Sequence, residues 1–198
     1  KWWDFGRKQG GLFIFTPTIT AANSYWYKGT ADALYQNIKF LKESHEPYVV
    51  IASGDGIYKL DYNKVLEEHI SNGADITVVC KDMAPGEDDI NRFGVVKMND
   101  DGRIIDFEEK PLVAGTNTVS IGVYVIRRRQ LIELLETCAN EGRNDFVRDI
   151  LVRYKGVKRI YGYKMDTYWR NIGTKESYYR ANMDSQERCK RFLLQAAS

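Results

Sequence analysis

The most restrictive feature of this sequence is an apolar segment, an amphipathic helix and a second apolar segment, in that order, between residues 48 and 80. Tyr48–Ala52 and Ile76–Cys80 are continuous apolar runs of strand length, which are typical of strands covered on both faces. The segment between them has apolar residues at helical spacing, begins at Asp61 and stops at Gly73. This order is typical of a βαβ unit, and we expect its two strands to be parallel.

The rest of the chain predicts further elements of both kinds. A helix is expected from about Thr30, with Thr30 as its N-cap. Residues 93–98 and 103–107 flank the turn sequence Asn-Asp-Asp-Gly, which is typical of a β-hairpin. Further strands are expected at 120–126 and 159–165, and further helices at 130–138, at 145–154 and from about 174. We therefore predict an α/β fold with a mostly parallel sheet and an inserted β-hairpin.

Composition and charge exclude several classes of protein. A chain of 198 residues, of which 43% are hydrophobic and 28% charged, can form one domain with a substantial core. Its net charge is only +2, so we expect neither nucleic acid nor a membrane as a partner. The apolar segments are too short to span a bilayer. The three cysteines, Cys80, Cys138 and Cys189, lack metal-ligand spacing, and we expect a cytoplasmic protein without a disulfide framework.

The first candidate for chemistry is the segment Ser53-Gly54-Asp55-Gly56, which follows the first buried strand. Open parallel sheets bind ligands beyond the carboxyl ends of their strands. The glycines allow a sharp turn and a close approach of a ligand. The Asp55 carboxylate suits Mg²⁺, which prefers oxygen ligands. A turn stabilised by an aspartate side chain explains the same residues equally well.

Two other segments combine charge with turns. In Phe107–Pro111, Lys110 could hold a phosphate as a point charge and Glu109 could accept hydrogen bonds from sugar hydroxyls. Taken alone, such a run is more often a solvated strand end. Residues 168–174 form a polar loop before a helix N-terminus, where anions are favoured, although aromatic packing at a helix entry is an alternative. We find no P-loop or dinucleotide-binding fingerprint, and His69 is more typical of a packed helix residue than of a catalyst.

Taken in order, several segments resemble a known family. They are Trp26–Ala33, Ser53–Asp55, Ile57–Tyr62, Arg92–Gly94, Phe107–Pro111, Ser120–Tyr124, Tyr168–Thr174 and Tyr179–Asp184. Together they resemble glucose-1-phosphate adenylyltransferase, also called ADP-glucose pyrophosphorylase. The resemblance extends from about Trp26 to Asp184, and eight segments in the same order make chance similarity very improbable.

The resemblance implies a Rossmann-like nucleotidyltransferase domain that acts in glycogen biosynthesis. Members make ADP-glucose and pyrophosphate from ATP and glucose 1-phosphate, and Mg²⁺ offsets the charge of the leaving group. By the same resemblance Asp55 is catalytic and holds the metal, and Lys110 binds the sugar phosphate. Four further residues would line the glucose 1-phosphate site, namely Tyr27, Gly94, Glu109 and Ser120.

The sequence departs from the family pattern in several places. Residues 1–198 match part of the nucleotidyltransferase domain, without its N-terminal Gly-rich nucleotide loop and without the C-terminal β-helix domain; a chain without that loop is not expected to turn over. Asn171 stands where the family has a second metal-binding aspartate, and Gly56 stands where it has a histidine. An asparagine removes a full negative charge, so we expect Mg²⁺ to bind weakly or not at all.

These departures favour one member type. The opening residues, 3–8 and 10–13, look most like the regulatory, GlgD-type subunit, which pairs with a catalytic paralogue. We therefore expect a regulatory, weakly active or inactive subunit in a hetero-oligomer, with a homo-oligomer as the alternative assembly. A fully catalytic subunit, or another sugar-phosphate nucleotidyltransferase, is the alternative function. A glycosyltransferase is disfavoured because no Asp-x-Asp sequence follows a strand.

Overall fold

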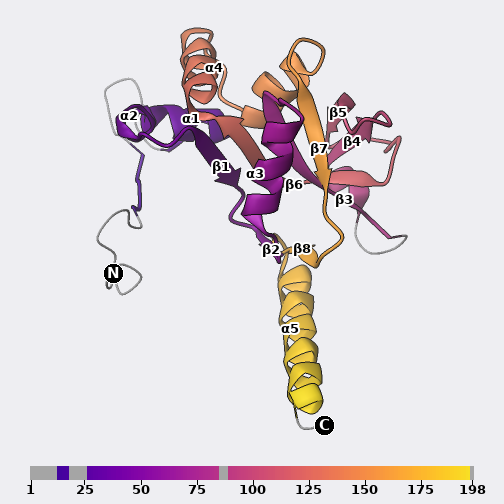
Figure 1. Cartoon of the computed structure of the whole chain (residues 1–198). Coiled ribbons are helices and arrows are strands. Elements are labelled where there is room, and N and C mark those ends of the chain that lie inside the picture. The colour runs from indigo at the N-terminus through magenta and orange to yellow at the C-terminus, as the bar shows by residue number, and fades with distance from the viewer. Residues whose placement is uncertain (1–12, 18–25, 85–88, 197–198) are drawn as a thin grey trace.

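The structure is a computed structural model, and it describes residues 13–17, 26–84 and 89–196. A six-stranded sheet occupies its centre, with helices on both faces (Figure 1). The strands of this sheet are β1 (Tyr48–Ala52), β3 (Ile76–Asp82), β4 (Gly94–Met98), β5 (Ile104–Glu109), β6 (Thr118–Arg127) and β7 (Ile160–Lys164). A second, two-stranded sheet joins β2 (Gly56–Tyr58) to β8 (Trp169–Asn171). The α/β class expected from the sequence is confirmed.

Helices cover the sheet and extend from it. They are α1 (Thr30–Gln36), α2 (Ile38–Glu43), α3 (Tyr62–Ser71), the short 3₁₀ helix η2 (Ile90–Arg92), α4 (Arg128–Asn140), the π-helix η3 (Val147–Val152) and α5 (Lys175–Ala196). Helix α5 leaves the body of the domain beside β8 and projects away from it (Figure 1). No helix within the described ranges is both long and apolar enough to cross a membrane.

The pairing of the strands differs from the expected mostly parallel sheet. β1 and β3 run in the same direction, as a βαβ unit requires, but they are not neighbours, because both pair with the long strand β6 in antiparallel register. β4 also pairs antiparallel with β6 and with β5, and among the described strands only β3 and β7 form a parallel pair. The cause is that β6, which follows both strands of the unit in the chain, inserts between them. The β4–β5 hairpin itself is confirmed.

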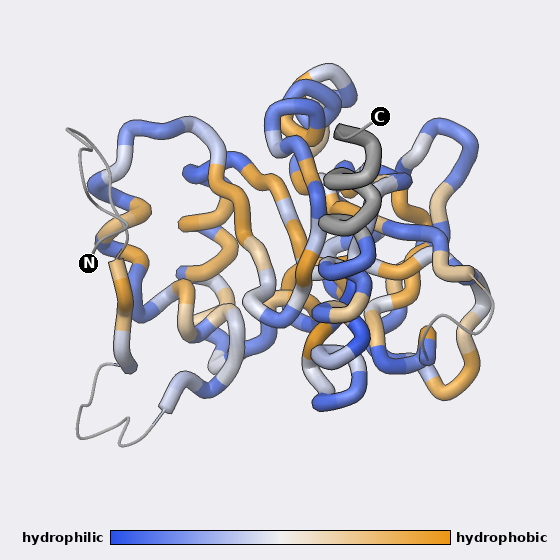
Figure 2. Tube along the Cα trace, turned by 90° about the horizontal axis from the view of Figure 1, so that it is seen from below, coloured by the Kyte–Doolittle hydropathy of each residue, from blue (hydrophilic) through white to orange (hydrophobic). Residues whose placement is uncertain are grey.

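Alternation along β6 divides the core into two clusters. Tyr124 and Ile126 face α1, α4 and η3, whereas Val123 and Val125 face α3 and the β2–β8 sheet. Successive side chains of a strand point to opposite faces, so one strand can serve both clusters. Hydrophobic residues accordingly concentrate along the strands of the interior, and the peripheral turns are largely hydrophilic (Figure 2).

Several local expectations hold and others fail. Asp61 caps α3 by accepting a hydrogen bond from the Asn63 N–H at 3.0 Å, and Gly73 follows the helix with φ of +56°, as predicted. Thr30 is not the N-cap of α1, because Gly29 holds that position. β1 is half exposed and not covered on both faces, because Val49 and Ile51 pack against the core while Val50, on the opposite face, is 44% exposed.

The packing interpretation of His69 is confirmed. Its ring is buried, with 1% of its surface exposed, and Nδ1 lies 2.8 Å from Oγ1 of Thr77. Cys80 and Cys138 are buried free thiols. Cys189 and the opening residues 1–12 lie outside the part of the chain for which side chains are described.

Candidate functional site

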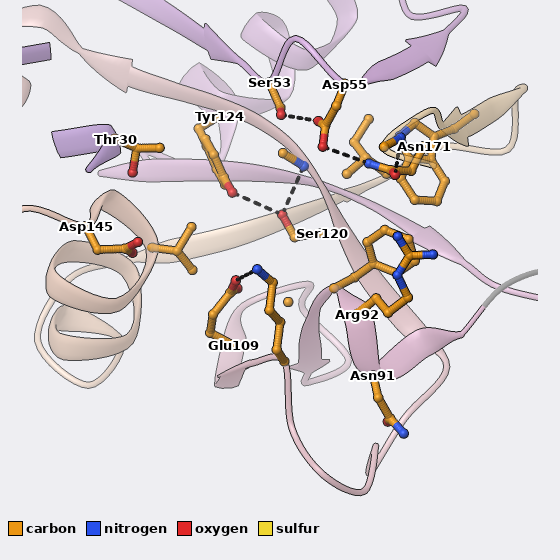
Figure 3. Close-up of a pocket in the computed structure, with 18 residues that line it drawn as sticks. Thr30, Ser53, Asp55, Asn91, Arg92, Glu109, Ser120, Tyr124, Asp145 and Asn171 are labelled. Atoms are coloured by element: carbon orange, nitrogen blue, oxygen red, sulfur yellow. Dashed lines mark hydrogen bonds and ion pairs between the residues drawn. The ribbon is translucent and has the colours of Figure 1, made fainter. Parts of the chain in front are cut away.

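A cavity of about 730 Å³ opens along one edge of β6. β1 pairs with residues 123–127 of β6, and β4 pairs with β6 at Val119, so β1 ends shortly before β4 begins. The cavity occupies this gap, and β6 supplies its floor. Its lining includes Thr30, Ser53, Asp55, Arg92, Gly94, Glu109, Lys110, Ser120, Tyr124, Asp145, Trp169 and Asn171 (Figure 3).

A bulge in β6 shapes the floor of this pocket. The register between β3 and β6 shifts between Val79 and Cys80, where two extra residues, Ile121 and Gly122, are accommodated. Gly122 takes φ of +76°, a left-handed conformation that suits glycine, and its carbonyl accepts a hydrogen bond from the Ser53 N–H at 2.8 Å. The bulge therefore fixes both the floor, including Ser120, and the loop that carries Asp55.

Asp55 and Asn171 meet at one end of the pocket. Asn171 ends β8 and lies opposite Gly56 of β2, so the small sheet brings together residues 116 positions apart. Nδ2 of Asn171 donates to a carboxylate oxygen of Asp55 at 3.0 Å, and the Ser53 hydroxyl donates to the other oxygen. Oδ1 of Asn171 accepts from the Gly173 N–H at 2.9 Å.

These contacts determine the charge of Asp55. Partial burial would raise the pKa of this carboxyl, but the hydrogen bonds from Ser53 and Asn171, together with the nearby Lys110 ammonium, hold its pKa below the ordinary value. Asp55 is therefore ionised at neutral pH, and both of its carboxylate oxygens accept hydrogen bonds from neighbouring side chains.

Mg²⁺ coordination needs several oxygen ligands around one position. Asn171 presents an N–H donor, not an oxygen, to Asp55, and its own oxygen is engaged by Gly173. Within the described ranges no group of three or more carboxylate, imidazole or thiol side chains converges on a point. As arranged, the pair offers a divalent cation one anionic ligand, Asp55, and places an amide N–H where a second oxygen ligand would be needed.

Lys110 and Glu109 lie at the end of β5, where the chain turns sharply. Lys110 has φ of +49°, the one left-handed non-glycine residue in the described ranges, and its N–H donates to the Phe93 carbonyl at 3.1 Å. Such a conformation is unfavourable for a residue with a side chain and is enriched at functional sites. Its ammonium lies 3.7 Å from Oε1 of Glu109, and burial raises the pKa of that carboxyl despite the neighbouring cation.

Gly94 leaves room for this pair. A Cβ added at Gly94 would approach the Phe107 ring to 2.8 Å and a carboxylate oxygen of Glu109 to 3.1 Å. A glycine is therefore needed here for packing, and no side chain at residue 94 reaches into the pocket.

The pocket brings together most of the residues predicted from the sequence, but not Tyr27. Asp55, Gly94, Glu109, Lys110, Ser120 and Asn171 all line it, and the binding roles assigned to them stay predictions. Tyr27 does not line it: its hydroxyl accepts from the Asn37 amide at 3.2 Å and donates to the Phe15 carbonyl at 3.3 Å.

The structure adds residues that sequence reasoning missed, notably Thr30, Tyr124 and Asp145. Tyr124 is buried and its hydroxyl lies 3.4 Å from that of Ser120, and burial raises its pKa above the ordinary value. Asp145 faces the cavity from the side opposite Asn171 (Figure 3). The sequence signal for Tyr124 was its place in the strand after Ser120, whereas nothing near Asp145 distinguished it from an ordinary helix-capping aspartate.

Fold and pocket together define a class of protein. This is an α/β domain with a cavity beside the strand ends, and the lining of that cavity combines cationic, carboxylate and hydroxyl groups. Such a lining suits a small ligand that carries both a phosphate and sugar-like hydroxyls.

Comparison with known proteins gives the family. The Nucleotidyl transferase family model matches residues 6–188, and the chain belongs to this family. It is 38% identical over 186 residues to the glucose-1-phosphate adenylyltransferase of Fervidobacterium nodosum, covering 93% of this chain and 44% of that protein. The enzyme of the same name from Pseudothermotoga lettingae is 41% identical, covering 92% of this chain and 43% of that protein. The chain thus spans less than half the length of these relatives.

Proposed function

We propose that this chain is the sugar-phosphate-binding part of an ADP-glucose pyrophosphorylase subunit, which acts in glycogen biosynthesis on glucose 1-phosphate, ATP and ADP-glucose. The identity to two glucose-1-phosphate adenylyltransferases supports the substrate class. The pocket supports it independently, because a lysine, three carboxylates and hydroxyls suit a phosphorylated hexose. In this proposal Lys110 holds the phosphate. Glu109 and Asp145 accept hydrogen bonds from the sugar hydroxyls, and the Ser120 hydroxyl can accept or donate one.

The subunit is regulatory, and weakly active or inactive on its own. The observation that carries this part of the proposal is the direct hydrogen bond from Asn171 to Asp55. It satisfies the Asp55 carboxylate with a neutral amide, so Mg²⁺ binds weakly or not at all. A family reaction that depends on charge neutralisation at the departing pyrophosphate would then be slow.

The proposal includes a partner and a compartment. A catalytic paralogue completes the assembly as a hetero-oligomer, and a homo-oligomer is the alternative. The chain works in the cytoplasm, where its buried free thiols, Cys80 and Cys138, stay reduced.

A fully catalytic subunit is the second candidate, because Asp55, Glu109, Lys110 and Ser120 are all present around one pocket. The rate of pyrophosphate release by the full-length protein, measured alone and with the candidate catalytic subunit, distinguishes a regulatory subunit from a catalytic one. A regulatory subunit gives negligible release alone and raises the rate of its partner. A rate alone that equals the rate of the mixture would contradict the regulatory assignment and support the catalytic one.

A further inference from the structure

On the side of the pocket opposite Asn171, residues 144 and 145 are held in place by the buried carboxylate of Asp149 (Figure 3). Asp149, in the π-helix η3, has only 4% of its surface exposed. One of its carboxylate oxygens accepts hydrogen bonds from the backbone N–H groups of Asn144 at 3.1 Å and Asp145 at 2.9 Å. The other oxygen lies 3.4 Å from Nε of Arg148 and 3.6 Å from Nη1 of Arg143.

The pattern is reciprocal. The Asp145 side chain accepts from the Arg148 N–H at 2.8 Å, while Asp149 reaches back to the Asp145 N–H. This resembles a capping box, in which a residue three positions along reaches back to the N-cap. Here the acid stands four positions along, and the turn that follows is a π-helix, whose wider turns are rare and occur frequently at functional sites.

The same segment also fixes the start of α1. The Asn144 carbonyl accepts from the N–H groups of Ala31 at 2.8 Å and Asp32 at 3.3 Å, and the Phe146 N–H donates to the Thr30 hydroxyl at 2.9 Å. A Cβ added at Gly29 would lie 2.4 Å from the Asn144 carbonyl oxygen, so the two segments fit closely. Asp145 and Thr30 both line the pocket, on the side opposite Asn171 (Figure 3).

We propose that Asp149 is a positioning residue for sugar recognition, which holds Asp145 and Thr30 at the pocket without touching the ligand itself. If the Asp149 carboxylate is removed, the backbone N–H groups of Asn144 and Asp145 lose their acceptor. Unpaired buried N–H groups are energetically unfavourable, so the segment must move to give them new partners. Such movement would displace the wall that faces the sugar hydroxyls. It would leave Lys110 in place, because the backbone N–H of that residue is held by the carbonyl of Phe93, which directly precedes β4 and lies outside this segment. The inference rests on the proposed binding of a hexose 1-phosphate.

Isothermal titration calorimetry of the full chain, with glucose 1-phosphate and with inorganic phosphate as ligands, tests the positioning role of Asp149. We expect Asp149→Ala to raise the Kd for glucose 1-phosphate about tenfold or more and to change the Kd for phosphate less than about twofold. Asp149→Asn keeps a carbonyl acceptor for the N–H groups and restores most of the sugar-phosphate affinity. Asp106→Ala, which removes a partly buried aspartate paired with Lys155 away from the pocket, is the matched control.

Unchanged glucose 1-phosphate affinity in Asp149→Ala, or an equal loss for both ligands, overturns the positioning role. If Asp149→Ala does not fold, Asp149→Leu, which also removes the acceptor oxygens but fills the buried space, serves in the same comparison. Hydrogen exchange of the Asn144 and Asp145 amides in ligand-free protein separates this inference from the proposed function. Faster exchange in Asp149→Ala supports the role of Asp149 in holding this segment even if the wild-type protein binds no hexose 1-phosphate, whereas unchanged exchange refutes it.

Discussion

At the scale of single residues, the contact between Asn171 and Asp55 leads to a test of metal binding. Asn171→Asp would place two carboxylates in hydrogen-bond range, where they repel each other without a cation between them. We expect the variant to be less stable than the wild type without metal at neutral pH, and to bind Mn²⁺ at least about tenfold more tightly. Titration calorimetry with Mn²⁺ and denaturation with and without Mg²⁺ measure the two effects.

Asn91→Asp provides the matched control, because it adds the same charge to the pocket lining away from Asp55. It should leave Mn²⁺ affinity nearly unchanged. Equal Mn²⁺ affinity in the wild type and in Asn171→Asp would show that the asparagine is not what limits metal binding.

His69 leads to a second residue-scale prediction, about the pH dependence of stability. Burial, with the Arg127 charge nearby, lowers its pKa to about 4 from an ordinary 6.5. As pH falls below 6.5 the unfolded chain takes up the proton first, so folding stability decreases down to about pH 4 and this loss then levels off. The shift corresponds to about 3 kcal/mol of stability lost.

Denaturant unfolding of wild type and His69→Gln between pH 7 and 4 isolates this contribution, because the carboxylates titrate alike in both proteins. We expect the variant to be less stable at pH 7, where it loses the packed ring, but to have a flatter dependence on pH. Parallel stability curves for the two proteins would rule out His69 as the titrating group.

At the scale of elements, the bulge in β6 joins the floor of the pocket to the Asp55 loop. Gly122→Ala would place a side chain in a left-handed conformation, with its Cβ 2.8 Å from Cβ of Ser53. We expect a loss of about 2 kcal/mol in the free energy of unfolding. We also expect weaker binding of glucose 1-phosphate, because Ser53 and Ser120 both shift.

Urea denaturation and titration calorimetry measure these two quantities on the same protein. Gly115→Ala is the control, since a Cβ there meets no atom within 4 Å. If Gly122→Ala matched Gly115→Ala in both measurements, the bulge would be tolerant of a side chain and would not shape the pocket.

At the scale of the whole molecule, the sequence predicts local features such as caps and turns, but not which residues far apart in the chain come into contact. The sequence alone indicates the Asp61 cap, which depends on a short-range hydrogen bond. It also indicates the Asn-Asp-Asp-Gly turn of the β4–β5 hairpin, where Gly102 takes a positive φ. The insertion of β6 between β1 and β3 cannot be read from hydrophobic periodicity, which reports burial but not neighbours. For the same reason Asp55 and Lys110 were predicted from their strand ends, whereas Asp145 was recognised only once the fold placed it at the pocket.

The pocket takes residues from segments between Thr30 and Gly173, so ligand binding should stabilise the domain as a unit. A ligand that binds only the folded state at a concentration of 100 times its Kd adds about 2.7 kcal/mol. For a domain of this size that corresponds to a rise of about 5–10 °C in Tm. We expect this rise with glucose 1-phosphate and a smaller one with free glucose, which lacks the phosphate that Lys110 would hold.

Because the Asn171 amide satisfies Asp55 without a cation, EDTA should leave that rise in Tm unchanged. Differential scanning calorimetry at several ligand concentrations, with Mg²⁺ or with EDTA, gives the comparison. A rise that appears only with Mg²⁺ would mean that the sugar phosphate is bound through a metal, and the regulatory assignment would lose its structural basis. If no sugar phosphate raised Tm, the proposal that the pocket binds a sugar phosphate would be wrong. A pocket assembled from so many separate segments cannot bind its ligand without stabilising the fold that brings them together.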